Sequence, residues 1–140
     1  KDAHRSGFRW AIGFGHVEGG ETEPKAIPEE MNLTWPEAWD ILRNDCEVKA
    51  RWLRKQIKVP VTTPMFNALV SLTMNAGEGN VEKGPVLPLL NEQKYVAACA
   101  AFIDPERGHI FAYKDGERVR VNGLIVRRAT EMAMFMTKKE

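Results

Sequence analysis

The stretch TTPMFNALVSLTMNAGEGN, residues 62–80, decides the fold. Thr62 or Thr63 is typical of a helix N-cap, Pro64 of a first helical turn, and Asn75-Ala76-Gly77 of a helix end. Apolar residues between these ends leave little polar surface: Met65, Phe66, Ala68, Leu69, Val70, Leu72 and Met74. A helix that is apolar on most sides is buried by its neighbours. We therefore predict a central helix around which other elements pack.

A second helix is expected upstream of this stretch. The motif TWPE is a capping box, with Thr34 as N-cap and Glu37 three residues later. Apolar residues then recur at spacings of three and four: Trp39, Leu42, Cys46, Ala50, Leu53 and Ile57. The pattern predicts an amphipathic helix of roughly 24 residues that Pro60 ends. Its basic face is either a solvated surface or a site for a polyanion, and it carries Arg51, Arg54, Lys55 and Lys58.

Downstream, the pattern indicates two short helices, a hairpin and a closing helix. The short helices are expected at GPVLPLLN (84–91) and QKYVAACAAFI (93–103), and Asp115-Gly116 marks the hairpin turn. The last helix, LIVRRATEMAMFM (124–136), has an apolar stripe of Ile125, Ala129, Met132, Ala133 and Met136.

Near the start of the chain, apolar residues alternate over 8–14, which predicts a short strand or hairpin. The expected class is α+β, mostly helical.

Length and composition predict one domain over residues 1–140. Hydrophobic residues make up 44% of the chain and charged residues 28%, which is enough for a core. The net charge of +1 argues against a dedicated nucleic-acid binder. No apolar run is long enough for a membrane span. Cys46 and Cys99 are expected to be free thiols rather than a disulfide, because both fall in apolar helical patterns.

The N-terminal segment holds the first candidate binding residues. Gly13 and Gly15 flank Phe14, which either marks a twisted strand packed on a helix or lets a strand line a cleft where a sugar or peptide lies. His16 follows as a possible metal ligand, general base or partner of the local backbone. No second His or Cys stands at metal-ligand spacing, so we expect no metal site.

Carboxylates flank the same segment. Asp2, Glu18, Glu21 and Glu23 are typical of a solvated loop, yet carboxylates beside a glycine-lined cleft are also what glycosidic chemistry requires. One carboxylic acid protonates the leaving oxygen and a second carboxylate stabilises the transition state or activates water. The spacing does not single out a pair.

Two adjacent arginines are the remaining candidates. Arg127 and Arg128 point about 100° apart on a helix, so at most one shares the apolar stripe. An arginine near a core pairs with a carboxylate. That partner is either Glu131, in a structural role, or a catalytic acid.

Four segments, in order along the chain, resemble the phage-type lysozymes, the endolysin muramidases of glycoside hydrolase family 24. WAIGFGH resembles the family's T-I-G-Y-G-H strand, and MFNALVSLTMNAGEGN its central helix. VLPLLNEQKYVAACAAF is similar to its S-x-L-L-x-x-L-N-x-x-x-Y-x-x-A-A stretch, and NGLIVRRATEMAMF to the closing G-L-x-x-R-R-x-x-E. The resemblance implies a lysozyme-like fold, with a small N-terminal β lobe and a helical lobe around the central helix.

The resemblance also implies an activity and its residues. The family hydrolyses the β-1,4 bond between N-acetylmuramic acid and N-acetylglucosamine without metal or cofactor. Asp2 matches the aspartate of its Tyr-x-Asp element, and Ala11 stands where the family has a catalytic threonine. The family's glutamate acid is expected upstream of Lys1, in a first helix outside this sequence. Arg127, with Arg128 second, would support that acid, and the residues expected to line the cleft are Asn75, Gly77 and Gly13 to His16.

We therefore expect a monomeric muramidase that binds peptidoglycan strands and causes cell-wall lysis. It would be made in the host cytoplasm, act in the periplasm or wall, bind no nucleic acid and make no stable membrane insertion. The alternative is a peptidoglycan-binding module that has lost its general acid, as Ala11 suggests.

Overall fold

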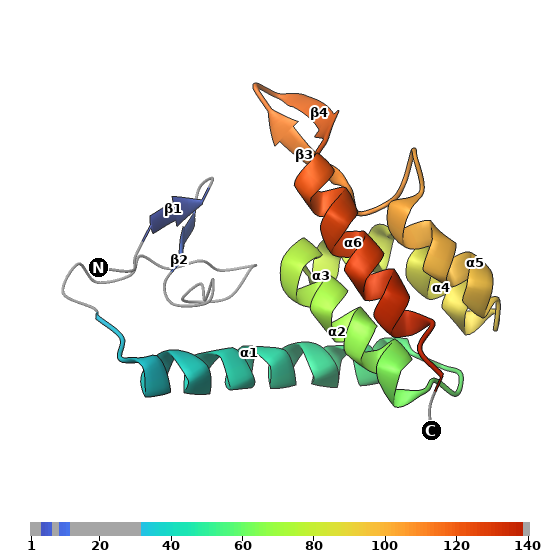
Figure 1. The fold of residues 1–140 in the computed structure, drawn as a ribbon, viewed down its shortest axis with the longest axis horizontal. Coiled ribbons are helices and arrows are strands. Elements are labelled where there is room, and N and C mark those ends of the chain that lie inside the picture. The colour runs from blue at the N-terminus through green and yellow to red at the C-terminus, as the bar shows by residue number, and fades with distance from the viewer. Residues whose placement is uncertain (1–3, 7–8, 12–31, 139–140) are drawn as a thin grey trace. The chain divides into compact units, whose positions relative to one another are not determined.

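The computed structural model describes residues 4–6, 9–11 and 32–138 of the chain (Figure 1). The chain divides into two units, Lys1–Val48 and Lys49–Glu140, and each is described by itself. The expectation of one domain over 1–140 stays a prediction.

The first unit contains a small antiparallel sheet and the beginning of a long helix. Strands β1 (His4–Ser6) and β2 (Arg9–Ala11) pair with Ser6 opposite Arg9. The strand expected within residues 8–14 is thus present over Arg9–Ala11.

Helix α1 (Trp35–Gln56) begins in the first unit and runs into the second. The predicted capping box is present, since the Thr34 N–H donates to Glu37 Oε2 at 2.8 Å and the Glu37 N–H donates to Thr34 Oγ1 at 3.3 Å. These bonds satisfy N–H groups that a helix leaves unpaired at its first turn. The predicted apolar stripe is buried only towards the end of α1, at Ala50 and Leu53.

Helix α2 (Thr63–Ala76) is the centre of the second unit, as its sequence predicts. Thr62 caps it by accepting the Met65 N–H, 3.2 Å away. Leu69 and Leu72 are fully buried, and burial of each such side chain contributes about 1.5–3 kcal/mol. Helix α6 (Asn122–Phe135) packs alongside α2, as Figure 1 shows.

The turn after α2 was predicted, but the helix that follows it was not. Gly77 ends α2 with φ 91° and ψ 151°, a conformation that only glycine adopts easily. It leads directly into the short helix α3 (Glu78–Lys83). The sequence EGNVEK carries too few apolar residues for a periodic pattern, so α3 left no signal in the sequence.

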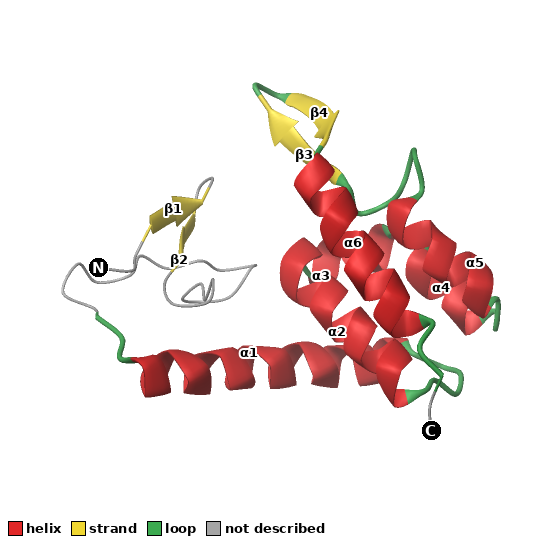
Figure 2. Ribbon diagram, viewed as in Figure 1, coloured by secondary structure: helices red, strands yellow, loops and turns green. Residues whose placement is uncertain are grey.

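The expected short helices are confirmed as α4 (Val86–Asn91) and α5 (Tyr95–Ala100), with the 3-10 turn η1 (Ala101–Ile103) after them (Figure 2). The expected hairpin is also present, with strands β3 (Phe111–Lys114) and β4 (Glu117–Arg120) paired antiparallel.

The hairpin turn follows the predicted chemistry. Asp115 and Gly116 both have positive φ, at 52° and 81°. A two-residue loop with this backbone matches the twist of the strands that it joins. The turn therefore fixes the register, with Lys114 opposite Glu117.

The apolar stripe predicted for the last helix is wrong in register. The buried face of α6 carries Arg128, Glu131 and Phe135, whereas Ala129 and Ala133 are exposed. The apolar stripe left out Arg128 and Glu131, although one of the two alternatives from the sequence was an arginine near the core paired with Glu131, and the structure shows this pair. The structure buries these two because they neutralise each other, as described below.

Cys46 and Cys99 are free thiols, as predicted, although Cys46 is only partly buried. Among the described residues, no helix combines the length and apolar character needed to span a bilayer.

Candidate functional site

A cavity of about 460 Å³ opens in the second unit. Its walls come from the ends of α2 and α3, the loop over residues 104–110, the β3–β4 hairpin and the first half of α6. Arg128, one of the lining residues, is a fully buried charged side chain.

Arg128 binds three elements through one guanidinium. Its Nη2 donates to Asn75 Oδ1 at 2.8 Å and to Glu131 Oε2 at 3.2 Å, and its Nη1 donates to the His109 carbonyl at 3.3 Å. Its Nε lies 2.7 Å from Glu131 Oε1 as an ion pair. Arg128 therefore joins α6 to the end of α2 and to the loop before β3.

Glu131 completes the buried network from the other side. Ser71 Oγ on α2 donates to Glu131 Oε2 at 2.6 Å. Burial raises the pKa of Glu131, and the Ser71 hydroxyl and the Arg128 guanidinium oppose that rise. The mutual contact of the pair and the bond from α2 thus offset part of the cost of burying these two groups.

His109 lies in the cavity wall, and it is partly buried. Burial, and then the charge of Arg128, lower the pKa of His109 to about 4, so the ring is neutral at pH 7. Its Nε2 is buried with no hydrogen-bond partner and packs close to Gly84. A β-carbon on Gly84 would lie 2.7 Å from that nitrogen, so glycine is required for the present position of the ring.

Three exposed cations from different segments surround this polar interior: Lys83, Arg107 and Arg118. Arg118 Nη2 donates to the Glu106 carbonyl, and its guanidinium carbon lies 3.7 Å from the centroid of the Phe111 ring. Arg107 Nη2 donates to the Lys83 carbonyl at 3.5 Å. The cavity therefore has a neutral histidine, a compensated arginine and a basic rim.

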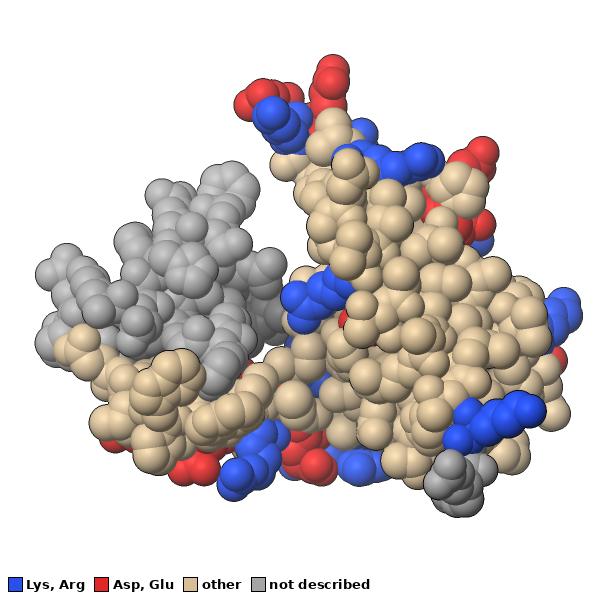
Figure 3. Space-filling model, in the orientation of Figure 1, with Lys and Arg blue, Asp and Glu red and all other residues tan. Residues whose placement is uncertain are grey.

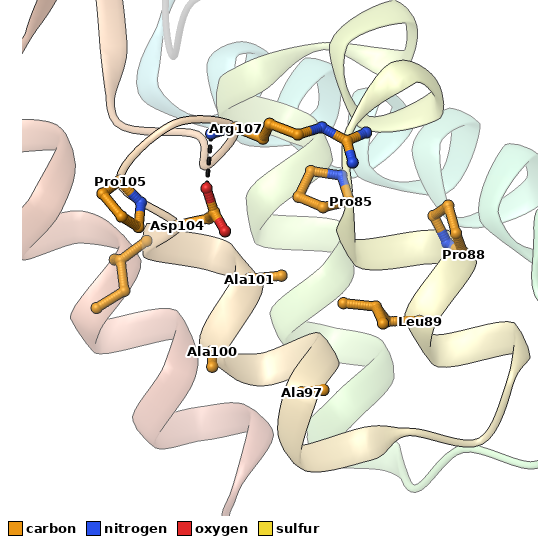
Figure 4. A pocket seen from close by; sticks show the side chains of 10 residues that line it. Pro85, Pro88, Leu89, Ala97, Ala100, Ala101, Asp104, Pro105 and Arg107 are labelled. Carbon is orange, nitrogen blue, oxygen red and sulfur yellow. Dashed lines mark hydrogen bonds between the residues drawn. The ribbon is translucent and has the colours of Figure 1, made fainter.

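A second cavity of about 650 Å³ has a different character (Figure 4). Proline, alanine and leucine side chains from the α4 and α5 region line most of it. At one side Asp104 Oδ1 accepts the Arg107 N–H at 2.7 Å, as the dashed line in Figure 4 shows. Its lining offers few polar groups for chemistry. Within the described residues no group of three or more His, Cys, Asp or Glu side chains comes together as a metal site.

The structure brings together some of the residues singled out from the sequence. Asn75 and Arg128 share the 460 Å³ cavity, and Gly77 ends the helix that carries Asn75. Arg127 was the first candidate from the sequence for the arginine that supports the catalytic acid. It is exposed and does not line the cavity, because Arg128 rather than Arg127 lies on the buried face of α6. Asp2 and the segment Gly13 to His16 lie outside the described residues.

Sequence reasoning missed His109 and the three rim cations. His109 is isolated in the sequence and is brought to the site by a contact with Gly84 that no local pattern encodes. Gly84 alone gave no signal, because the need for a glycine there becomes visible only once His109 is placed beside it.

Comparison with known proteins agrees with the resemblance found in the sequence. The family model for phage lysozyme matches residues 1–131. The endolysin of Bacillus phage PZA is 35% identical over 126 residues, which cover 90% of this chain and 43% of that protein. The endolysin of Acyrthosiphon pisum secondary endosymbiont phage 1 is 32% identical over 127 residues, or 91% of this chain and 80% of that protein. The chain thus spans less than half the length of the first relative.

Two solved structures share the fold. The muramidase domain of SpmX from Asticaccaulis excentricus has a TM-score of 0.82 at 28% identity, covering 98% of this chain and 86% of that one. An endolysin from Escherichia coli O157:H7 phage FAHEc1 has a TM-score of 0.80 at 26% identity, covering 99% and 85%. The mostly helical α+β architecture predicted from the sequence is therefore the lysozyme-like fold, and the chain belongs to the phage lysozyme family.

Proposed function

We propose that this chain is an endolysin-type muramidase, which hydrolyses the β-1,4 bond between N-acetylmuramic acid and N-acetylglucosamine in peptidoglycan. The observation that carries the proposal is the family match over residues 1–131. The buried Arg128–Glu131 network supports it, because a rigid charged interior behind a polar cavity holds substrate-binding groups in fixed positions.

Asp2 is proposed as one of the two carboxyl groups that glycoside hydrolysis requires. Peptidoglycan strands are the proposed partner, with the protein acting as a monomer that binds no nucleic acid. It would be made in the host cytoplasm and act on the wall.

The test is the release of reducing ends from purified peptidoglycan by the full-length gene product. We expect cleavage by the wild-type protein and a loss of at least about 100-fold in kcat for Asp2→Asn, with an unchanged melting temperature. Lys138→Gln, an exposed substitution after α6, is the matched control and should keep full activity.

Binding to insoluble peptidoglycan with no new reducing ends would contradict the proposal and favour a binding module without catalysis. Full activity of Asp2→Asn would remove that residue from the mechanism while leaving the enzyme assignment in place.

A further inference from the structure

The basic rim of the 460 Å³ cavity has no role in the chemistry proposed so far. Among the described residues that line this cavity there is no carboxylate, whereas four carry positive charge. Glu131 compensates Arg128 from behind the lining. Lys83, Arg107 and Arg118 leave the cavity with a positive potential, and such a potential attracts anions.

Both rim arginines are positioned rather than merely exposed, and Arg107 Nη2 donates to the Lys83 carbonyl at 3.5 Å. Arg118 is bonded to the Glu106 carbonyl and stacked on Phe111. The loop that supplies this carbonyl is itself held by Asp104, whose Oδ1 accepts the N–H groups of Glu106 and Arg107 at 2.9 and 2.7 Å.

A guanidinium has five N–H donors, so one bond to a carbonyl leaves donors for a ligand. A held guanidinium loses little side-chain entropy when a ligand binds to it. The rim is therefore ready to bind a planar anion before the anion arrives.

The geometry of a guanidinium suits a carboxylate, which it binds through two parallel N–H···O bonds. A neutral sugar ring carries no negative charge that could pair with the three cations. The acidic groups of peptidoglycan are the carboxylates on its muramic acid residues, either in the attached peptide or, where that peptide is absent, in the lactyl group. On the face seen in Figure 3, blue side chains of the second unit stand apart among tan and red ones, unlike the continuous basic surface that binds nucleic acid.

We propose that Arg118, Arg107 and Lys83 bind a carboxylate on the muramic acid side of the substrate and so select acidic peptidoglycan over neutral glycan. This inference rests on the proposed function, because that function supplies the substrate. Arg118 is a specificity residue in this assignment and takes no part in bond cleavage.

The experiment compares Arg118→Gln, Arg107→Gln and the conservative Arg118→Lys with the control Lys138→Gln on two substrates. One substrate is intact peptidoglycan, and the other is glycan stripped of its peptides by an amidase. We expect Arg118→Gln to raise KM for intact peptidoglycan about tenfold with little change in kcat, the loss typical of one charge-assisted hydrogen bond. Arg118→Lys should recover part of the affinity, and added salt should weaken wild-type binding.

A loss confined to intact peptidoglycan identifies the peptide carboxylate, and a loss confined to the stripped glycan identifies the lactyl carboxylate. An equal loss on both substrates shows that the rim binds either carboxylate. If Arg118→Gln and Arg107→Gln both match Lys138→Gln on both substrates, the inference is wrong. It is also wrong if Arg118→Gln abolishes a DNA gel shift while leaving KM unchanged. A wild-type protein that cleaves neither substrate refutes the proposed function instead. NMR titration with a muramyl tripeptide then tests directly whether the rim residues bind a carboxylate.

Discussion

Arg128 and Glu131 depend on each other because both are charged and both are buried. Glu131→Gln removes the negative charge and leaves the guanidinium uncompensated, which typically costs about 3–5 kcal/mol. We expect a loss of this size in the free energy of unfolding, measured by urea denaturation. Arg127→Gln is the matched control on the same helix and should change stability by less than about 0.5 kcal/mol, since Arg127 is exposed.

The double variant Arg128→Met with Glu131→Met tests the reason for this cost. With both charges removed, the protein should be more stable than Glu131→Gln, because no unpaired charge remains. A double variant less stable than the single one would show that the hydrogen bonds to Asn75 and Ser71, rather than the charge balance, dominate.

The lowered pKa of His109 makes the stability of the folded protein depend on pH. Its pKa is about 4 in the folded protein and about 6.5 when unfolded, so the unfolded chain takes up the proton first. The stability contributed by the neutral ring is complete above pH 6.5 and is lost as the pH falls towards 4, by up to about 3 kcal/mol.

Urea denaturation between pH 7 and pH 4 measures this loss. Because carboxylates titrate in the same range, the quantity to follow is the difference between wild type and His109→Gln. That difference should narrow or reverse at low pH, and a difference that is constant with pH would contradict a neutral buried imidazole.

At the scale of elements, the end of α3 is fixed by its contact with the loop before β3. A methyl group at Gly84 would lie 2.7 Å from His109 Nε2 and 3.1 Å from the Asn80 carbonyl oxygen. Gly84→Ala should therefore cost about 1–3 kcal/mol, as overpacking does. Gly79→Ala is the control, because Gly79 lies in α3 with open space around it, and it should stabilise by about 0.4–1 kcal/mol.

Thermal denaturation of the two alanine variants compares them directly. Adding His109→Ala to Gly84→Ala should return part of the lost stability, because the smaller side chain removes the clash. Equal melting temperatures for Gly84→Ala and Gly79→Ala would contradict the contact.

Elements whose ends carry their own signals were predictable from sequence. The capping box at Thr34, the cap at Thr62 and the turn at Asp115-Gly116 are all confirmed, since each is a local bond or backbone preference. The pairing of an arginine with Glu131 was one of two alternatives from the sequence, and it is present for Arg128. The full burial of Arg128 was not predictable, because it depends on α2 rather than on hydrophobicity.

At the scale of the whole molecule, the hydrophobic core belongs to the second unit. Every buried residue of the core cluster lies between Leu53 and Phe135. A fragment over residues 33–140 keeps all of these residues together with the cap of α1, so it should fold without the preceding segment. We expect a single sigmoidal transition in its thermal melt by circular dichroism.

Leu69→Ala in this fragment is the informative comparison. It removes a fully buried side chain from α2 and should lower stability by about 2–5 kcal/mol. A fragment that melts without a cooperative transition would show that the core needs the first 32 residues.

The family and the helical architecture were accessible from sequence because four ordered segments carry them, whereas the composition of the cavity was not. Lys83, Arg107, Arg118 and His109 come from three separate parts of the chain and meet only in the fold. The roles of Asp2 and of Gly13 to His16 stay predictions, since these residues lie outside the described part of the chain.

The ion pair inside α6 also constrains descent. A substitution at position 128 or 131 alone leaves one buried charge without its partner and destabilises the protein. Selection against misfolded protein removes most such variants before the second position changes. Relatives that lack Arg128 should therefore also lack Glu131, so that the two positions change together in evolution.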